Sequence, residues 1–124
     1  MVLAEQVSDA HLAGLRADGV SYIFAGGRSL DLRRALETLN AELGIERLLL
    51  EGGGLVNGSF LRAGLVDEVS LILWPAIDGA SGAPGIFHSA DEEADGPAPV
   101  GAMRLIGSDV LADGDVWLRY RLQA

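Results

Sequence analysis

Residues 48 to 58 read LLLEGGGLVNG, and this stretch is the strongest indication of the fold class. A run of leucines ends in one carboxylate, Glu51, and three glycines follow it at residues 52 to 54. A buried strand that leads through a glycine turn into a helix can hold a phosphate, because glycine lets backbone N–H groups close on an anion. The helix N-terminus adds about half a positive charge. The stretch therefore predicts an α/β protein with an anion-binding turn.

The residues at the start of the chain alternate between strand and helix signals. Val2 to Ala4 is typical of the end of a strand, and Ser8 is a helix N-cap before a predicted helix from about Asp9 to Ala17. Gly19 predicts the end of this helix. Val20 to Ala25 is rich in β-branched and aromatic residues, which indicates a second strand.

A second helix and a third strand are expected before the glycine turn. Asp31 is an N-cap candidate, and apolar residues recur at steps of three and four from Leu32 to Leu43 before Gly44 closes the helix. Ile45 to Leu50 is predicted as a strand that is buried on both faces, as in a parallel sheet. The order of strands and helices predicts right-handed crossovers between parallel strands.

The second half of the chain has a different pattern. A short helix is expected from about Val56 to Ala63, followed by a long strand from Val66 to Trp74. Arg104 to Val110 and Val116 to Leu122 alternate apolar and polar residues, and the Asp113-Gly114 pair between them indicates a hairpin. We therefore expect antiparallel strands here, with loops at residues 77–85 and 92–99, and one domain over residues 1–124.

Composition narrows the classes of function. The chain has 124 residues and a dispersed hydrophobic fraction of 49%, without a run of the roughly 18 apolar residues that would cross a bilayer. Its N-terminus lacks the features of a signal peptide, so a soluble, cytoplasmic protein is expected. With no cysteine and two histidines, a metal site is not expected. The net charge of −9 argues against nucleic acid and anionic membranes as partners.

The residues around the glycine turn each have a structural and a functional interpretation. The glycines are either a tight turn or a pyrophosphate site, and they do not form the G-x-G-x-x-G pattern of dinucleotide-binding folds. Glu51 is either an acceptor for the N–H groups of the turn or a ligand contact at the end of a strand. Gly26, Gly27 and Arg28 end the preceding strand at the same expected edge, where Arg28 either meets a phosphate or is a solvated surface arginine.

Residues 51 to 75, EGGGLVNGSFLRAGLVDEVSLILWP, resemble the C-terminal reductase domain of the bifunctional riboflavin-biosynthesis deaminase/reductase, a member of the dihydrofolate-reductase-like superfamily. The resemblance rests on the acid before the glycines, on Asn57 after them, and on the Ala63 to Glu68 step. It implies a dihydrofolate-reductase-like, three-layer α/β fold, with a parallel βαβαβ first half and antiparallel C-terminal strands. Asp67 and Glu68 are then residues of the turn and strand entry, not a paired-carboxylate site.

The same resemblance implies an NADPH-dependent reductase related to the 5-amino-6-(5-phosphoribosylamino)uracil reductase of riboflavin biosynthesis. The glycine loop and the following helix then hold the pyrophosphate of NADPH, with Asn57 and Ser59 as polar contributors, and Glu51 contacts the pyrimidine substrate. Catalytic residues are not assigned. The residues expected to contact the cofactor are Gly26, Gly27, Arg28, Gly52, Gly53, Gly54, Leu55, Val56, Asn57, Gly58 and Ser59.

Two departures from the family leave alternatives open. The family domain is usually longer at its N-terminus, so we expect this chain to begin partway through it and to cover exposed apolar surface by forming a homodimer. Strand exchange and pairing with a second polypeptide that carries the missing half are the alternatives. A carboxylate such as Glu5 close to the 2′-phosphate of NADPH would repel it, whereas close to a ribose 2′-hydroxyl it would favour NADH. NADH is therefore possible in place of NADPH. The alternatives to a reductase are a non-catalytic nucleotide-binding or assembly module and a purely structural fragment.

Overall fold

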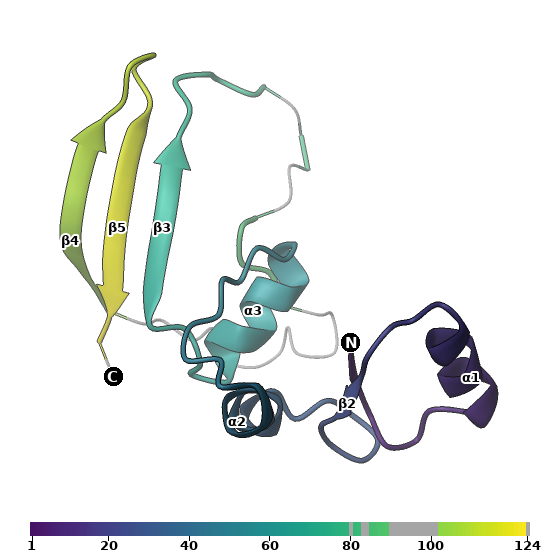
Figure 1. Cartoon of the computed structure of the whole chain (residues 1–124). Coiled ribbons are helices and arrows are strands. Elements are labelled where there is room, and N and C mark those ends of the chain that lie inside the picture. Colours follow the sequence, from purple (N-terminus) through teal and green to yellow (C-terminus); the bar gives the residue numbers. More distant parts are fainter. Residues whose placement is uncertain (80, 83–84, 90–101, 124) are drawn as a thin grey trace. The chain divides into compact units, whose positions relative to one another are not determined.

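The computed structural model describes residues 1–79, 81–82, 85–89 and 102–123. The chain divides into two compact units, Met1–Leu50 and Glu51–Ala124, and each is described by itself (Figure 1). The single-domain organisation stays a prediction. No helix among the described residues has the length and apolar character to cross a membrane.

The first unit holds two short parallel strands and two helices. Its elements are β1 (Val2–Leu3), α1 (Asp9–Ala17), β2 (Ile23–Phe24) and α2 (Leu32–Leu43). Val2 pairs with Ile23 and Leu3 with Phe24, so the parallel arrangement around α1 is as predicted, although β2 is shorter than expected. The buried apolar residues of the described chain, Leu15, Ala25 and Ala35, all belong to this unit.

The ends of both helices in this unit lie where capping signals predict them. The Ser8 hydroxyl accepts a hydrogen bond from the backbone N–H of His11 at 3.3 Å, and the Asp31 carboxylate accepts one from Arg34 at 3.0 Å. Gly44 closes α2 with a φ of 63°, the left-handed conformation that glycine adopts without steric cost. These local contacts explain why the bounds of α1 and α2 were predictable.

The predicted strand from Ile45 to Leu50 is wrong. The structure has no strand over these residues, and the leucines expected to be buried on both faces include Leu48, which is 48% exposed, and Leu49, which is 76% exposed. A strand exists only where a neighbour accepts and donates its ladder hydrogen bonds. The described residues provide no such neighbour here, so apolar composition alone does not make this segment a strand.

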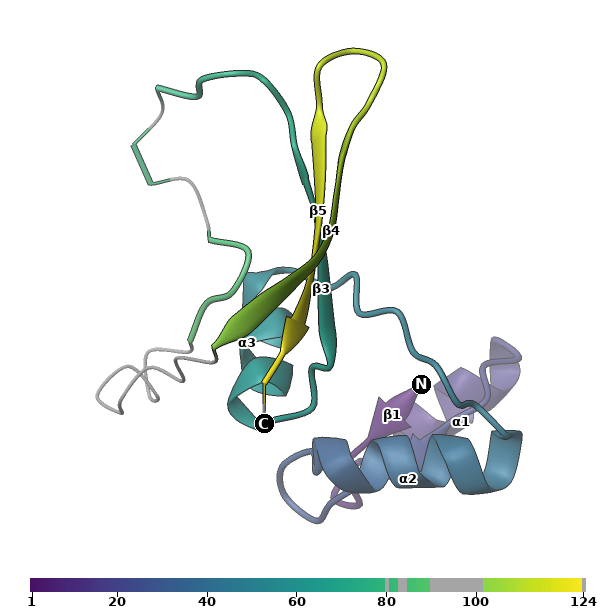
Figure 2. The same ribbon diagram turned by 90° about the vertical axis from the view of Figure 1, so that its left-hand side faces the viewer.

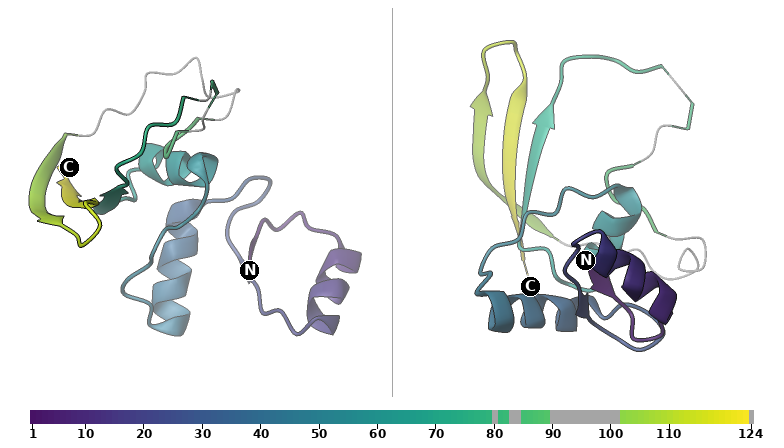
Figure 3. Two further views of the ribbon diagram at one scale, coloured as in Figure 1. Left: turned by 90° about the horizontal axis from the view of Figure 1, so that it is seen from above. Right: turned by 45° about the vertical axis from the view of Figure 1, so that its right-hand side comes forward.

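The second unit combines one helix with an antiparallel sheet. Its elements are α3 (Gly54–Arg62), β3 (Glu68–Leu73), β4 (Met103–Val110) and β5 (Val116–Leu122). The strand order is β3-β5-β4, so β5 lies in the centre, as the right-hand view of Figure 3 shows. The antiparallel second half is therefore as predicted, and α3 begins two residues before the predicted start at Val56.

The turn between β4 and β5 forms the predicted hairpin. The N–H of Leu111 donates to the Asp115 carbonyl at 2.8 Å, and Gly114 has a φ of 86°, which favours glycine (Figure 2). The register of β4 against β5 shifts between Leu105 and Gly107, which marks a β-bulge. The predicted loop at residues 92–99 lies outside the described residues.

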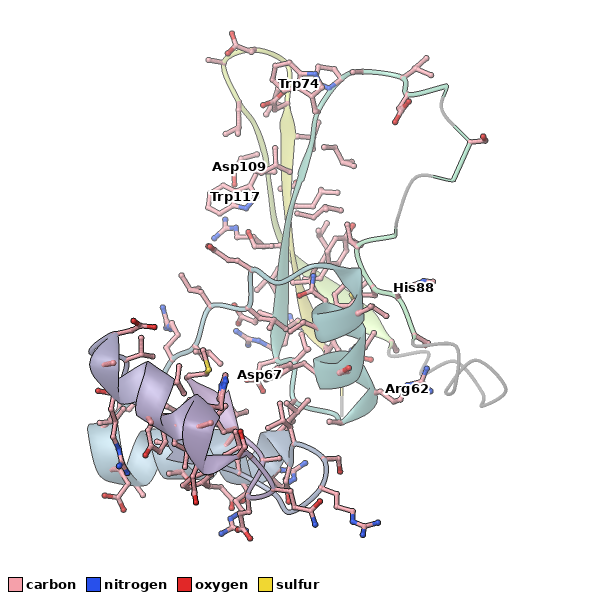
Figure 4. The ribbon with its side chains drawn as sticks, turned by 90° about the vertical axis from the view of Figure 1, so that its right-hand side faces the viewer. Arg62, Asp67, Trp74, His88, Asp109 and Trp117 are labelled. Carbon is pink, nitrogen blue, oxygen red and sulfur yellow. The ribbon has the colours of Figure 1, made fainter. Side chains whose placement is uncertain are left out.

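One face of the antiparallel sheet carries a ladder of polar cross-strand pairs. The Arg121 guanidinium lies 2.6 Å from the Glu68 carboxylate, and the Trp117 indole N–H donates to the Ser70 hydroxyl at 2.8 Å. Asp109 and Trp117 are register partners and lie on the same side of the sheet (Figure 4). Beyond the end of β3, Trp74 is 66% exposed.

Candidate functional site

The N-terminus of α3 presents backbone N–H donors at the glycine turn that no side chain caps. Gly53 is the N-cap, and no side chain caps this helix, whereas Ser8 caps α1 and Asp31 caps α2. The N–H of Asn57 is the first to bond within α3, to the Gly53 carbonyl at 3.1 Å. The N–H groups of residues 54 to 56 therefore precede the hydrogen-bond ladder, which is the arrangement that binds anions at helix N-termini.

The three glycines of the turn have different neighbours. A Cβ on Gly52 would lie 2.9 Å from Cβ and Cγ1 of Val56, and a Cβ on Gly54 would collide with the carbonyl oxygen of Gly85. A Cβ on Gly53 would meet nothing within 4 Å. Packing within the protein therefore requires glycine at residues 52 and 54, whereas at residue 53 the space is open to a ligand.

The side-chain donors that the sequence places near the turn are already engaged. The Asn57 amide donates to the Ile86 carbonyl at 3.0 Å, and the Ser59 hydroxyl donates to the Leu55 carbonyl at 3.0 Å. The remaining polar atom of Asn57, Oδ1, is buried without a partner among the described residues, and as an acceptor it does not attract an anion. An anion at this turn would be held by backbone N–H groups.

Glu51 begins the second unit and is exposed. It was expected at the end of a buried strand, but the residues before it form no strand, so a sheet edge does not position its carboxylate. Asp67 and Glu68 have the structural role that was expected for them. The Asp67 carbonyl accepts from the N–H of Leu122 at 2.9 Å, and Glu68 pairs with Arg121.

Gly26, Gly27 and Arg28 belong to the first unit, directly after β2. The Gly26 carbonyl accepts from the N–H of Glu5 at 2.9 Å, and the Gly27 carbonyl accepts from that of Gln6 at 3.3 Å. Gly26 has a φ of 96°, and Arg28 is exposed. The two glycines therefore extend the pairing of β1 and β2, which is a structural role that leaves Arg28 on the surface.

Glu5 has a cationic neighbour that sequence reasoning did not identify. The Arg34 guanidinium lies 3.5 Å from the Glu5 carboxylate, and both side chains are more than half exposed. An exposed pair of this kind contributes little to stability. It does partly neutralise the negative charge of Glu5.

Residues 85–89 contact α3 directly. The N–H of His88 donates to the Gly54 carbonyl at 2.9 Å, and the Arg62 guanidinium donates to the Ser89 hydroxyl. Gly58 is the buried residue of α3. The signal in the sequence was the pair of glycines at residues 54 and 58, because residues four apart lie on one face of a helix.

The donor and acceptor set of this region suits an anionic organic ligand better than a metal ion. Among residues 1–79, 81–82, 85–89 and 102–123, no three His, Asp or Glu side chains lie close enough together to hold a metal. The uncapped N–H groups of α3 are donors only, and Gly53 leaves space beside them. The turn can therefore bind a phosphate group through its backbone.

The chain is similar to known proteins over most of its length. The family model described as the RibD C-terminal domain matches residues 2–116. Over 75 residues the chain is 45% identical to the 2,5-diamino-6-ribosylamino-4(3H)-pyrimidinone 5′-phosphate reductase of Methanothermobacter thermautotrophicus, a match that covers 59% of this chain and 34% of that relative. The chain therefore spans about a third of the length of this curated relative.

Two solved structures have a similar fold. A pyrimidine reductase-like protein of Corynebacterium diphtheriae, 23% identical, superimposes with a TM-score of 0.76 over 99% of this chain and 48% of its own. RibD of Acinetobacter baumannii, 26% identical, superimposes with a TM-score of 0.69 over 94% of this chain and 30% of its own. The predicted dihydrofolate-reductase-like class of mixed α/β fold is thereby confirmed.

Proposed function

From the premise that this chain belongs to the RibD C-terminal domain family, we propose that it binds NADPH and serves the reduction of a phosphorylated ribosylaminopyrimidine in riboflavin biosynthesis. The name of the curated relative supports the substrate class, because that protein is a reductase of a ribosylamino-pyrimidinone 5′-phosphate. NADPH would supply the hydride. The role of this chain is to bind and orient the two reactants.

The uncapped N-terminus of α3 is the observation that carries the proposal. The N–H groups of Gly54, Leu55 and Val56 precede the helical ladder, and Gly53 leaves open space beside them. A pyrophosphate would accept these hydrogen bonds and would be stabilised by the helix dipole. This local attraction would offset the net charge of −9, which repels an anionic cofactor.

The remaining contacts in the proposal follow the family resemblance. Glu51 contacts the pyrimidine, whereas the cofactor contacts at Gly26, Gly27 and Arg28 stay predictions from their place after the second strand. NADH is the alternative cofactor. We also propose a cytoplasmic homodimer. Large exposed apolar side chains of the second unit support it, with Val110 at 79% and Trp74 at 66% exposure.

The alternative is a nucleotide-binding or assembly module without turnover. The exposure of Glu51, the candidate substrate contact, favours this alternative because reaction centres commonly exclude water from the reacting groups. Binding of NADPH without oxidation in the presence of pyrimidine ribosides would identify the module. Oxidation of NADPH that depends on such a substrate would identify the reductase.

The test is a titration with NADPH and with NADH, followed by nicotinamide fluorescence and by calorimetry. We expect micromolar binding to the parent chain and at least about tenfold weaker binding to Gly53→Val, because the added side chain occupies the space proposed for the pyrophosphate. Gly79→Val is the matched control, since a Cβ on Gly79 also meets nothing within 4 Å. Equal affinity of the parent and Gly53→Val, or no binding to the parent at millimolar cofactor, would contradict the assignment.

A further inference from the structure

α3 is a weak helix by its own sequence. It has nine residues, includes Gly54 and Gly58, and lacks a side-chain cap. Glycine within a helix costs about 1 kcal/mol relative to alanine, and helices this short are marginal in water without tertiary contacts. Tertiary contacts must therefore hold the helix in place.

Residues 85–89, which we call the strap, provide such contacts. Three hydrogen bonds connect the strap to α3. The N–H of His88 donates to the Gly54 carbonyl at 2.9 Å, the Asn57 amide donates to the Ile86 carbonyl at 3.0 Å, and Arg62 donates to the Ser89 hydroxyl. Together they run from the first residue of the helix to its last.

The two glycines of α3 allow the strap to approach the helix backbone. A Cβ on Gly58 would collide with the His88 carbonyl oxygen and would lie 2.8 Å from the His88 carbonyl carbon. A Cβ on Gly54 would collide with the Gly85 carbonyl and would lie 3.2 Å from Cβ of His88. The glycines lie one turn apart on the same face, so the low helix propensity of α3 is the cost of this close contact.

The strap is bonded to a peptide unit that belongs to the proposed anion site. The carbonyl of Gly54, which accepts from His88, is in the same peptide plane as the N–H of Leu55. A hydrogen bond to that carbonyl orients and polarises the N–H on the other side of the plane. The His88 side chain itself points away from α3 (Figure 4). His88 therefore contacts the helix through its backbone N–H and not through its imidazole.

We propose that docking of the strap is coupled to nucleotide binding at the N-terminus of α3, and that Asn57 is the positioning residue that holds the strap in place. The inference rests on the proposed function. It reassigns Asn57 from a cofactor contact to a residue that acts through the strap, because its amide is bonded to Ile86. Coupling between sites is reciprocal, so a nucleotide bound at α3 stabilises the docked strap by the same factor.

The test combines NADPH titration with amide hydrogen exchange on the full 124-residue chain. We expect Asn57→Ala to weaken NADPH binding by about three- to tenfold, the factor that one neutral hydrogen bond represents. We expect Gly58→Ala to weaken it at least as much, because the added Cβ would collide with the His88 carbonyl and displace the strap. Asn40→Ala is the matched control for Asn57, because the Asn40 amide donates to the Ile45 carbonyl at 3.1 Å in the other unit. Gly14→Ala is the helical glycine control, since its Cβ meets nothing within 4 Å.

Exchange of the His88 amide in the parent chain provides a readout that needs no variant. Saturating NADPH should slow this exchange, and faster exchange is expected in Asn57→Ala with and without the nucleotide. The coupling is overturned if the parent binds NADPH while His88 exchange does not change, or if both variants keep the parental affinity. A parent that binds no nucleotide overturns the proposed function and this coupling together. That outcome differs from the first two because it appears in the titration of the parent alone.

Discussion

At the scale of single residues, the glycines of this chain serve different purposes that their neighbours and dihedral angles distinguish. Gly14 and Gly44 both have open space where a Cβ would lie, but Gly44 has a φ of 63° and Gly14 lies within α1. Gly54 and Gly58 instead have backbone atoms within collision distance. The same residue type therefore ends one helix, weakens another and admits a close contact in a third.

Substitution of Gly14 and Gly44 by alanine should change stability in opposite directions. Gly14→Ala should raise the free energy of unfolding by about 0.5–1 kcal/mol, because alanine loses less backbone entropy in a helix. Gly44→Ala should lower it by about 1 kcal/mol, because a Cβ is strained in the left-handed conformation. Urea unfolding followed by circular dichroism measures both. A Gly44→Ala variant as stable as the parent would show that the end of α2 is not held in this conformation.

At the scale of secondary-structure elements, β4 and β5 contact each other through side chains that lie beside the β-bulge. The Arg119 guanidinium lies 4.5 Å from the centre of the Trp117 ring and 3.3 Å from the Asp109 carboxylate. A Cβ on Gly107 would lie 2.5 Å from Nη2 of Arg119. The glycine beside the bulge therefore leaves room for the arginine to stack on the tryptophan.

Gly107→Ala should displace the Arg119 guanidinium from Trp117 at small cost in stability, because the displaced atoms end a flexible side chain. The expected change is a shift in the fluorescence of Trp117, with the free energy of unfolding altered by less than about 0.5 kcal/mol. The measurement is made in a Trp74→Phe background, so that Trp117 is the one tryptophan that contributes to the fluorescence. The shift should be absent when Arg119→Ala is already present. If it persists there, its origin is not the stacked guanidinium.

At the scale of the whole molecule, the two compact units can be observed separately because both tryptophans, Trp74 and Trp117, belong to the second. Tryptophan fluorescence reports that unit, whereas far-ultraviolet circular dichroism reports helices of both. We expect the two thermal transitions to coincide, since a single cooperative domain was predicted for residues 1–124. Separate midpoints would mean that the units unfold independently.

The same thermal measurement tests the proposed homodimer when it is repeated at several protein concentrations. Association stabilises the folded state by mass action, so the midpoint should rise as the concentration increases. The exposed apolar residues of the second unit, such as Val110 at 79%, supply surface that a second copy would cover. A midpoint that is independent of concentration, with a monomer mass by light scattering, would contradict the homodimer.

Elements whose signals are local could be predicted from the amino-acid sequence. The N-caps Ser8 and Asp31, the terminal Gly44 and the Asp113-Gly114 hairpin each act within a few residues, and the structure places all four as predicted. The motif beginning at Glu51 also identified the family, because it depends on residue types at fixed spacing. These features need no knowledge of distant contacts.

Pairing between groups that are distant in the sequence could be known only from the folded structure. Residues 45 to 50 have the composition of a strand, but strand formation needs ladder partners that the described residues do not supply. Asn57 has the donors expected of a ligand contact, but its amide is bonded to Ile86, 29 residues away. Whether a segment pairs, and whether a donor remains free, depends on neighbours remote in sequence. For that reason local pattern predicted the helices and turns correctly and misassigned the third strand.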